Sequence, residues 1–264
     1  TRLRTVTGVQ TCALPIFAKY SGSGAVQWVR VGHGSPGVAV DRQGDIYFTG
    51  NVWTDFGDGP MECGKFTSTG ELAWVRTLQG AYGNGVALDA RGEPVFVGEF
   101  YGTLQLDGHE VHNDNVSHQD TLICKTDVTG NFQWALSGGG PEFDRATAIV
   151  CDRSGNCYVA GVIANASGTL GSFPLTVGAG DTDTFLARLF DANSFVPELK
   201  IANKQVGLAL TWAVEATNYI LEAATALPAI SWATVTNTPT VTATNRSVQL
   251  PLTGNARFFR LRQP

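Results

Sequence analysis

Short apolar runs separated by polar turns recur along the first two thirds of the chain. In residues 37–50, 85–98 and 148–161, a run of small residues ends in Asp, a Gly follows, and an aromatic-containing run begins. An Asp followed by Gly between two β-rich runs predicts a hairpin, because the carboxylate accepts backbone N–H bonds and Gly adopts a positive φ. The segments therefore predict equivalent β-hairpins that turn at Asp41, Asp89 and Asp152.

A further apolar strand with a basic residue near its end follows each hairpin, and a tryptophan comes shortly after it in most copies. The tryptophans recur about every 50 residues, a period typical of propellers and solenoids. Two hairpins in succession make a four-stranded antiparallel sheet, so each repeat predicts one such sheet. Because the turn aspartates and basic residues recur at equivalent places, we interpret them as structural. The basic positions are Lys19, Lys65, Lys125 and Arg188, and the tryptophans are Trp28, Trp74 and Trp134.

Composition agrees with an all-β, secreted type of protein. Charged residues make up 16% of the chain, against about 25% in average soluble domains. The net charge of −5 and the pI near 5.3 argue against nucleic acid as a partner, because no basic stripe is present to neutralise phosphates. No apolar run reaches the roughly 18 residues that a membrane-spanning helix needs.

The repeat resembles the bacterial seven-bladed β-propeller repeat family, whose units read roughly Asp-x-Phe-x-Ala-Lys, Gly-Asn-x-x-Trp and Ala-x-Ala-Val-Asp-x-x-Gly-Asn-x-Tyr-Val-x-Gly. The resemblance covers residues 17–190 and departs from the pattern at Pro94, Cys151 and Cys157. It implies a partial, open β-propeller of about three four-stranded blades over residues 17–192. Three repeats and the strand 183–189 do not close a ring, so we expect that upstream blades of the same chain are missing.

The first sixteen residues stand apart from this repeat. Residues 6–16 resemble a translated sequencing adapter, and the alternative is a genuine strand with a free Cys12. We expect residues 1–16 to pack against nothing, and Phe17 to be the first residue of the repeat.

Past Asp191 the pattern changes to alternating strands separated by Pro, Thr and Asn. Strands at 206–213, 218–223, 247–252 and 257–262 predict a small fibronectin type III-like or Ig-like β-sandwich over residues 197–264. We expect Trp212, Tyr219 and Trp232 to form its core. The closing segment 256–264 resembles the terminal module of large secreted proteins of Verrucomicrobia-like bacteria, which implies a spacer or surface-attachment role.

Long loops opposite the short turns are where we expect any function, since loops on a rigid scaffold carry binding sites. Aromatic side chains there could stack on sugar rings or anchor a protein, while packing between neighbouring blades explains them equally well. We therefore predict a non-catalytic loop face that binds polysaccharide or another surface protein. Its candidate residues are Trp53, Tyr82, His109, His112, His118, Phe143 and Arg145.

Other functions stay open on the sequence alone. The segment with His109, His112 and His118 could supply metal ligands, but the spacing matches no zinc pattern, and we expect a mobile, metal-free polar loop. No nucleophile elbow or phosphate loop is present, so we predict no catalytic residue and no cofactor. The alternatives are the remnant of a propeller-fold lyase or hydrolase acting on carbohydrate, and a purely structural spacer in an adhesin-like chain.

Two cysteines flank the third hairpin turn. Cys151 and Cys157 replace Val40 and Ile46 of the first repeat, positions that face each other across antiparallel strands. Such pairs lie close enough for a disulfide, which an extracellular or cell-surface protein would form. The alternative is that all the repeat cysteines are buried thiols, as we expect for Cys63 and Cys124.

Overall fold

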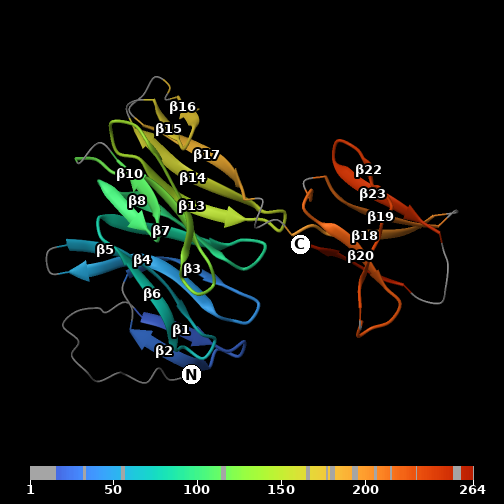
Figure 1. Ribbon diagram of the computed structural model, residues 1–264. Helices are drawn as coiled ribbons and strands as arrows, with labels where there is room; N and C mark the ends of the chain where they lie inside the picture. Colours follow the sequence, from blue (N-terminus) through green and yellow to red (C-terminus); the bar gives the residue numbers. More distant parts are fainter. Residues whose placement is uncertain are drawn as a thin grey trace. The chain divides into compact units, whose positions relative to one another are not determined.

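A computed structural model describes the fold (Figure 1). It describes residues 16–31, 34–54, 57–113, 117–164, 167–176, 178, 182–191, 196–204, 207–214, 216–229, 231–251 and 257–263. All regular structure in these ranges is β-strand, which confirms the predicted all-β class. The contacts divide the chain into two compact units: Thr1–Asp152 with Asn156–Leu189, and Arg153–Gly155 with Phe190–Pro264.

The first unit contains meandering antiparallel sheets. The first two repeat sheets contain the predicted four strands, whereas the third has three among the described residues. The first repeat sheet has the order β3-β4-β5-β6, and the second contains β7-β8-β11-β12 with a short hairpin, β15-β16, added beside β12. The third repeat sheet has the order β13-β14-β17, and β1-β2 form a two-stranded sheet ahead of the first. The strands are β1 (Ile16–Tyr20), β2 (Val26–Val31), β3 (Gly34–Val40), β4 (Ile46–Thr54), β5 (Gly57–Phe66), β6 (Leu72–Leu78), β7 (Ala81–Leu88), β8 (Pro94–Phe100), β11 (Asp120–Thr126), β12 (Phe132–Gly139), β13 (Arg145–Cys151), β14 (Asn156–Ala164), β15 (Gly168–Leu170), β16 (Phe173–Leu175) and β17 (Thr182–Phe190).

The predicted turns form as the residues require. Asp41 Oδ1 accepts hydrogen bonds from the backbone N–H groups of Gln43 and Asp45, at 2.9 Å each. Gly44 has a φ of 82°, a conformation that Gly adopts at no steric cost. Asp89 and Asp152 hold their turns in the same way. The Asp-x-x-Gly prediction is therefore confirmed at all three positions.

The repeat sheets stack through their first strands. β7 contacts β3 on one side and β13 on the other, and Figure 1 shows these strands near one another. A Cβ added at Gly37 would lie 2.8 Å from the Cα of Gly85, so glycine allows the two backbones to touch. Farther out, one apolar cluster joins the first and second sheets around Tyr47, Phe96 and Phe100. A second cluster joins the second and third sheets.

Three of the four recurring basic residues tie the third strand of a sheet to the turn between its first two strands, whereas Lys19 donates to Ser68 O of the neighbouring sheet at 2.9 Å. Lys65 Nζ lies 2.8 Å from Asp45 Oδ2. Lys125 Nζ, with its side chain fully buried, lies 2.7 Å from Asp89 Oδ2 and 2.9 Å from Glu93 Oε2. In the third sheet Arg188 Nε donates to Asn156 Oδ1 at 2.8 Å. These contacts support the structural interpretation of the basic positions.

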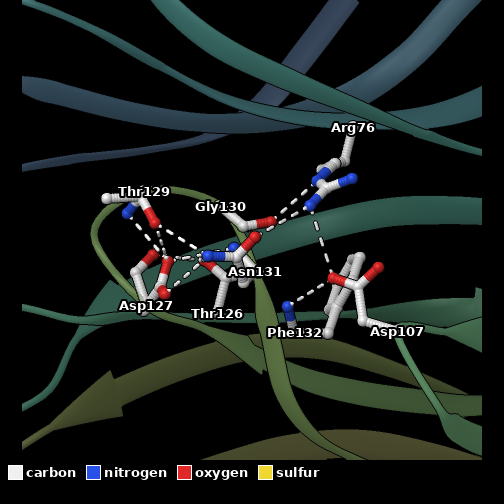
Figure 2. A network of polar contacts seen from close by, with 8 residues as sticks. All are labelled: Arg76, Asp107, Thr126, Asp127, Thr129, Gly130, Asn131 and Phe132. Carbon is white, nitrogen blue, oxygen red and sulfur yellow. Dashed lines mark hydrogen bonds and ion pairs between the residues drawn. The ribbon is translucent and has the colours of Figure 1, made fainter.

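A tryptophan and an arginine in the last strand of a sheet donate hydrogen bonds to backbone carbonyls of the next sheet. We call this pair of contacts the latch. Trp28 Nε1 donates to Ser68 O at 3.2 Å and Arg30 Nε to Gly70 O at 2.6 Å. One repeat later, Trp74 donates to Val128 O and Arg76 to Gly130 O. Figure 2 shows Arg76 reaching the turn around Gly130. The spacing of the repeat thus places the same latch at successive sheets.

Residues 102–120 differ from the predicted mobile loop. They contain an antiparallel hairpin, β9 (Thr103–Leu106) with β10 (His109–His112), and its Leu104, Leu106 and Val111 are buried in the cluster between the first two sheets. Its turn is anchored by Asp107, whose Oδ2 accepts from Phe132 N at 2.9 Å and lies 3.3 Å from Arg76 Nη2 (Figure 2). The loop prediction was therefore wrong for His109 and His112, because apolar residues on either side of Asp-Gly form paired strands. The mobility expected for the rest of the segment stays a prediction.

At the amino-terminal end, the described structure starts with β1 at Ile16. Residues 1–15 lie outside the described ranges, but Ile16 already pairs with Val31 in β1. Ile16, which was expected to lie outside the repeat, is therefore part of a described strand.

The second unit has two antiparallel sheets that enclose one apolar core. Trp212, Leu221 and Val248 lie at its centre with Tyr219 packed against them, as predicted. Trp232 instead lies against the guanidinium of Arg260, at 4.3 Å from the ring centre. The sheets are β18 (Lys200–Lys204), β19 (Gly207–Ala213), β23 (Asn245–Leu250) and β22 (Thr240–Val241), and β21 (Ala233–Thr234), β20 (Ile220–Ala224) and β24 (Phe258–Arg262).

Candidate functional site

A hollow of about 510 Å³ opens where β8 ends and β13 begins, at the strand ends away from the Asp-x-x-Gly turns. Its lining comes from the second and third repeat sheets and from the segment between them. Such concave surfaces with a few polar groups are typical of ligand sites. The lining includes Glu99, Gln119, Phe143, Arg145, Ala164 and Thr182.

Phe143 supplies an aromatic surface at this hollow. Its side chain is 52% exposed, and the His118 ring packs edge-on against it with the ring centres 4.5 Å apart. His118 is held in turn by Pro141 O, 3.2 Å from Nδ1, and lies 3.6 Å from a carboxylate oxygen of Glu142. The exposed Phe143 ring is therefore supported from one side and presents its remaining surface to solvent.

Asp144 holds the segment that carries Phe143. One carboxylate oxygen accepts from Gly140 N at 2.5 Å and the other from Ala164 N at 2.9 Å. Its backbone N–H donates to Gln119 O at 2.8 Å. Burial raises the pKa of this carboxyl group, although the two N–H donors act in the opposite direction. Both oxygens are used to fix the backbone, which is a structural role.

Glu99 lies deeper in the same hollow. Asn84 Nδ2 donates to Glu99 Oε2 at 2.8 Å and to Ala146 O at 3.0 Å, so the amide bridges the second and third repeat sheets. Burial raises the pKa of Glu99, an effect that Asn84 and the nearby Arg145 guanidinium partly offset. A carboxyl group with a raised pKa in a hollow is a candidate for ligand contact.

Four of the predicted binding residues come together here. Phe143 and Arg145 line the hollow, and His118 supports Phe143. Tyr82 pairs with Glu99 across β7 and β8, which places the two side chains on one face of the sheet. Its ring lies 6.2 Å from that of Tyr101.

The other predicted residues lie elsewhere. His109 and His112 are on β10, where His112 Nδ1 is 2.6 Å from Thr103 Oγ1. His112 lines a different hollow, of about 730 Å³, beside β12. Trp53 pairs with Asp58 along β4 and β5, and its side chain lies outside the described part. Within the described ranges, no group of three His, Cys, Asp or Glu side chains is arranged to hold a metal ion.

A disulfide joins Cys151 and Cys157, which are direct partners in the register of β13 and β14. Cys63 and Cys124 are buried free thiols in the cluster between the first two sheets. Burial raises the pKa of both thiols, that of Cys124 to about 12. These two therefore behave as small apolar residues.

Sequence reasoning missed Asn84, Glu99 and Gln119. Glu99 stands in the otherwise apolar run Val95–Phe100, and a carboxylate inside such a run is a signal that could have identified it. Asn84 carries no comparable signal. It lies where the pairing register of β7 with β8 shifts between Gly83 and Gly85, and its role depends on this bulge.

A scan against models of protein families finds no match to this chain, and a search of curated proteins finds none. Among the described residues there is no helix of the length and apolarity that crossing a membrane requires.

Proposed function

We propose that this protein is a non-catalytic binding protein, secreted or held at the cell surface, that uses the hollow at Phe143 to bind polysaccharide. The observation that carries the proposal is the exposed Phe143 ring beside polar groups of Glu99, Gln119 and Arg145. Sugar rings have an apolar face that stacks on an aromatic ring, and hydroxyl groups that pair with carboxylate, amide and guanidinium groups.

The carboxylates favour binding over hydrolysis. A carbohydrate hydrolase uses a pair of carboxyl groups that flank the scissile bond. Of the two carboxylates in the hollow, Asp144 uses both oxygens to accept backbone N–H bonds. Glu99 is then left without an available partner among the lining residues. This arrangement supports a binding role and weighs against a carbohydrate hydrolase that uses this hollow.

The rest of the chain supports presentation of this site outside the cell. The Cys151–Cys157 disulfide is typical of oxidising compartments. We further propose that the repeat sheets belong to an open β-propeller of the bacterial repeat type. In this proposal the second unit is a fibronectin type III-like spacer or attachment module, and another surface protein is the alternative partner of the loop face.

The test is affinity gel electrophoresis against a panel of soluble neutral and acidic polysaccharides. At least one should retard the protein, and Phe143→Ala should weaken retardation about tenfold, because a stacking ring is lost. Phe173→Ala is the matched control, since Phe173 is 74% exposed but lies on β16 away from the hollow. Equal loss in both variants, or no retardation by any polysaccharide, would contradict the proposal.

A further inference from the structure

Arg145 differs from the other arginines in the strands of the first unit. Arg30, Arg76 and Arg188 each donate to a carbonyl or amide oxygen and so help to hold the sheets. Arg145, at the start of β13, donates no hydrogen bond to any residue in the described ranges, and its side chain is exposed at the hollow. As far as the described residues go, its donors are therefore available to a ligand.

The chemistry of a guanidinium group selects the ligand. Its planar fork of N–H groups matches a carboxylate with two parallel hydrogen bonds, which are charge-assisted and stronger than bonds to neutral hydroxyl groups. Phe143 lies two residues away in the chain and lines the same hollow. An aromatic ring and a free guanidinium in one hollow suit a sugar ring that carries a carboxylate.

We propose that the hollow recognises an acidic saccharide, with a uronic-acid carboxylate bound by Arg145 and the sugar ring stacked on Phe143. This inference rests on the proposed saccharide-binding function and adds the class of sugar. Gln119 and Thr182 also line the hollow, where they can pair with the hydroxyl groups.

Glu99 makes this recognition dependent on pH. The charged and titratable groups around Glu99 come from several elements. They are Arg145 at the start of β13, the preceding Asp144, Tyr82 opposite Glu99 on β7, and Tyr101 just after β8. Among these only Arg145 is a cation, so an ionised Glu99 repels a bound carboxylate and a protonated Glu99 does not.

The sign of the pH effect follows from the pKa of Glu99. Burial places that pKa above the ordinary value of 4.5, and a bound anion raises it further. Binding therefore takes up a proton, and the affinity rises as the pH falls through the pKa of Glu99 in the complex. The uronate stays ionised in this range, because its own carboxyl group is a stronger acid.

The test uses titration calorimetry with an oligogalacturonide and the same oligosaccharide after chemical reduction of its carboxyl groups. The carboxylated form should bind about tenfold more tightly than the reduced form. Arg145→Ala should abolish that difference, whereas Arg42→Ala should preserve it, since Arg42 is an exposed arginine in the turn after β3. Glu99→Gln should tighten binding at neutral pH and flatten the rise in affinity as the pH falls.

The outcomes separate the two levels of the proposal. Equal affinity for both oligosaccharides, with Phe143→Ala still weakening each, overturns the acidic-saccharide inference and leaves saccharide binding in place. Tighter binding of a sulfated neutral oligosaccharide overturns the carboxylate assignment. Binding of no saccharide overturns both. Unchanged thermal midpoints of the Arg145→Ala and Glu99→Gln variants show that a lost preference arises at the site.

Discussion

The second and third repeat sheets both tie their third strand to the turn between their first two strands, but they use different groups to do so. In the second, the turn at Asp89 is tied to the third strand by a fully buried Lys125 that contacts two carboxylates. In the third, the equivalent Arg188 is exposed and donates to the neutral amide of Asn156. The third turn is closed in addition by the Cys151–Cys157 disulfide.

This difference shows what the repeat position requires. Each repeat has a hydrogen-bond donor near the end of the third strand. Its acceptor is charged in the second repeat and neutral in the third. Where the acceptors are buried and charged, loss of the donor leaves charges without compensation. Where the acceptor is a neutral amide and the donor is exposed, removing the donor lowers the stability only slightly. The stability of each repeat should therefore depend on different groups, although the backbone is alike.

The largest effect is expected from Lys125→Met. This change leaves the Asp89 carboxylate, 1% exposed, without its cation, and breaking a buried pair costs about 3–5 kcal/mol of unfolding free energy. Chemical denaturation measures it, with Lys200→Met as the control because Lys200 is 73% exposed. A loss below about 1 kcal/mol for Lys125→Met would contradict the assigned role.

The disulfide comes next. Replacing Cys151 and Cys157 by Ser should lower the unfolding free energy by about 2 kcal/mol, since the closed loop is short. Thiol labelling of unreduced, denatured protein followed by peptide mapping should modify Cys63 and Cys124 and leave Cys151 and Cys157 unmodified. In the native protein Cys63 and Cys124 should also resist labelling, because both are buried. Labelling of Cys151 before reduction would show that the bond is absent.

A smaller effect is expected in the first repeat sheet, where Lys65 and Asp45 keep 14% and 20% of their side chains exposed. Lys65→Met should cost about 1 kcal/mol, because solvent screens the pair. The hydrogen bond from Lys65 lowers the pKa of Asp45 below 3.8. Its contribution is therefore present above that pH and is lost as the pH falls through the lowered pKa. Denaturation in neutral and strongly acidic buffers should show a cost only in the former.

The smallest effect is expected from Arg188→Gln. The exposed guanidinium donates to a neutral amide, so its loss should cost at most about 1 kcal/mol. Arg188→Lys, which keeps a donor, should cost less still. A loss as large as that of Lys125→Met would mean that the basic position acts alike in all repeats, against the comparison.

Local patterns made much of the fold predictable. The Asp41, Asp89 and Asp152 turns rest on hydrogen bonds within five residues, so the sequence contains all that forms them. The β9-β10 hairpin could also have been predicted from Asp107-Gly108, which stand between short runs with apolar residues, although a polar loop was expected there.

The candidate site was less accessible to prediction. Phe143 and Arg145 could be proposed because aromatic and basic side chains in a long loop suggest binding. Glu99 was missed although it stands out in an apolar run, whereas Asn84 could not be proposed, because its contact with Ala146 depends on how β7 of one repeat meets β13 of the next. Neighbouring sheets set that geometry, and no local pattern encodes it.

The latch between sheets also has an evolutionary consequence. Trp28 and Trp74 donate to the main-chain carbonyls of Ser68 and Val128, and the receiving side chains differ without changing the bond. Every residue type supplies a carbonyl oxygen, so the receiving turn needs little beyond its glycine. An in-frame gene duplication of one repeat would therefore reproduce this contact between sheets without compensating substitutions in the receiving turn. Recombination alone could therefore lengthen or shorten such a chain.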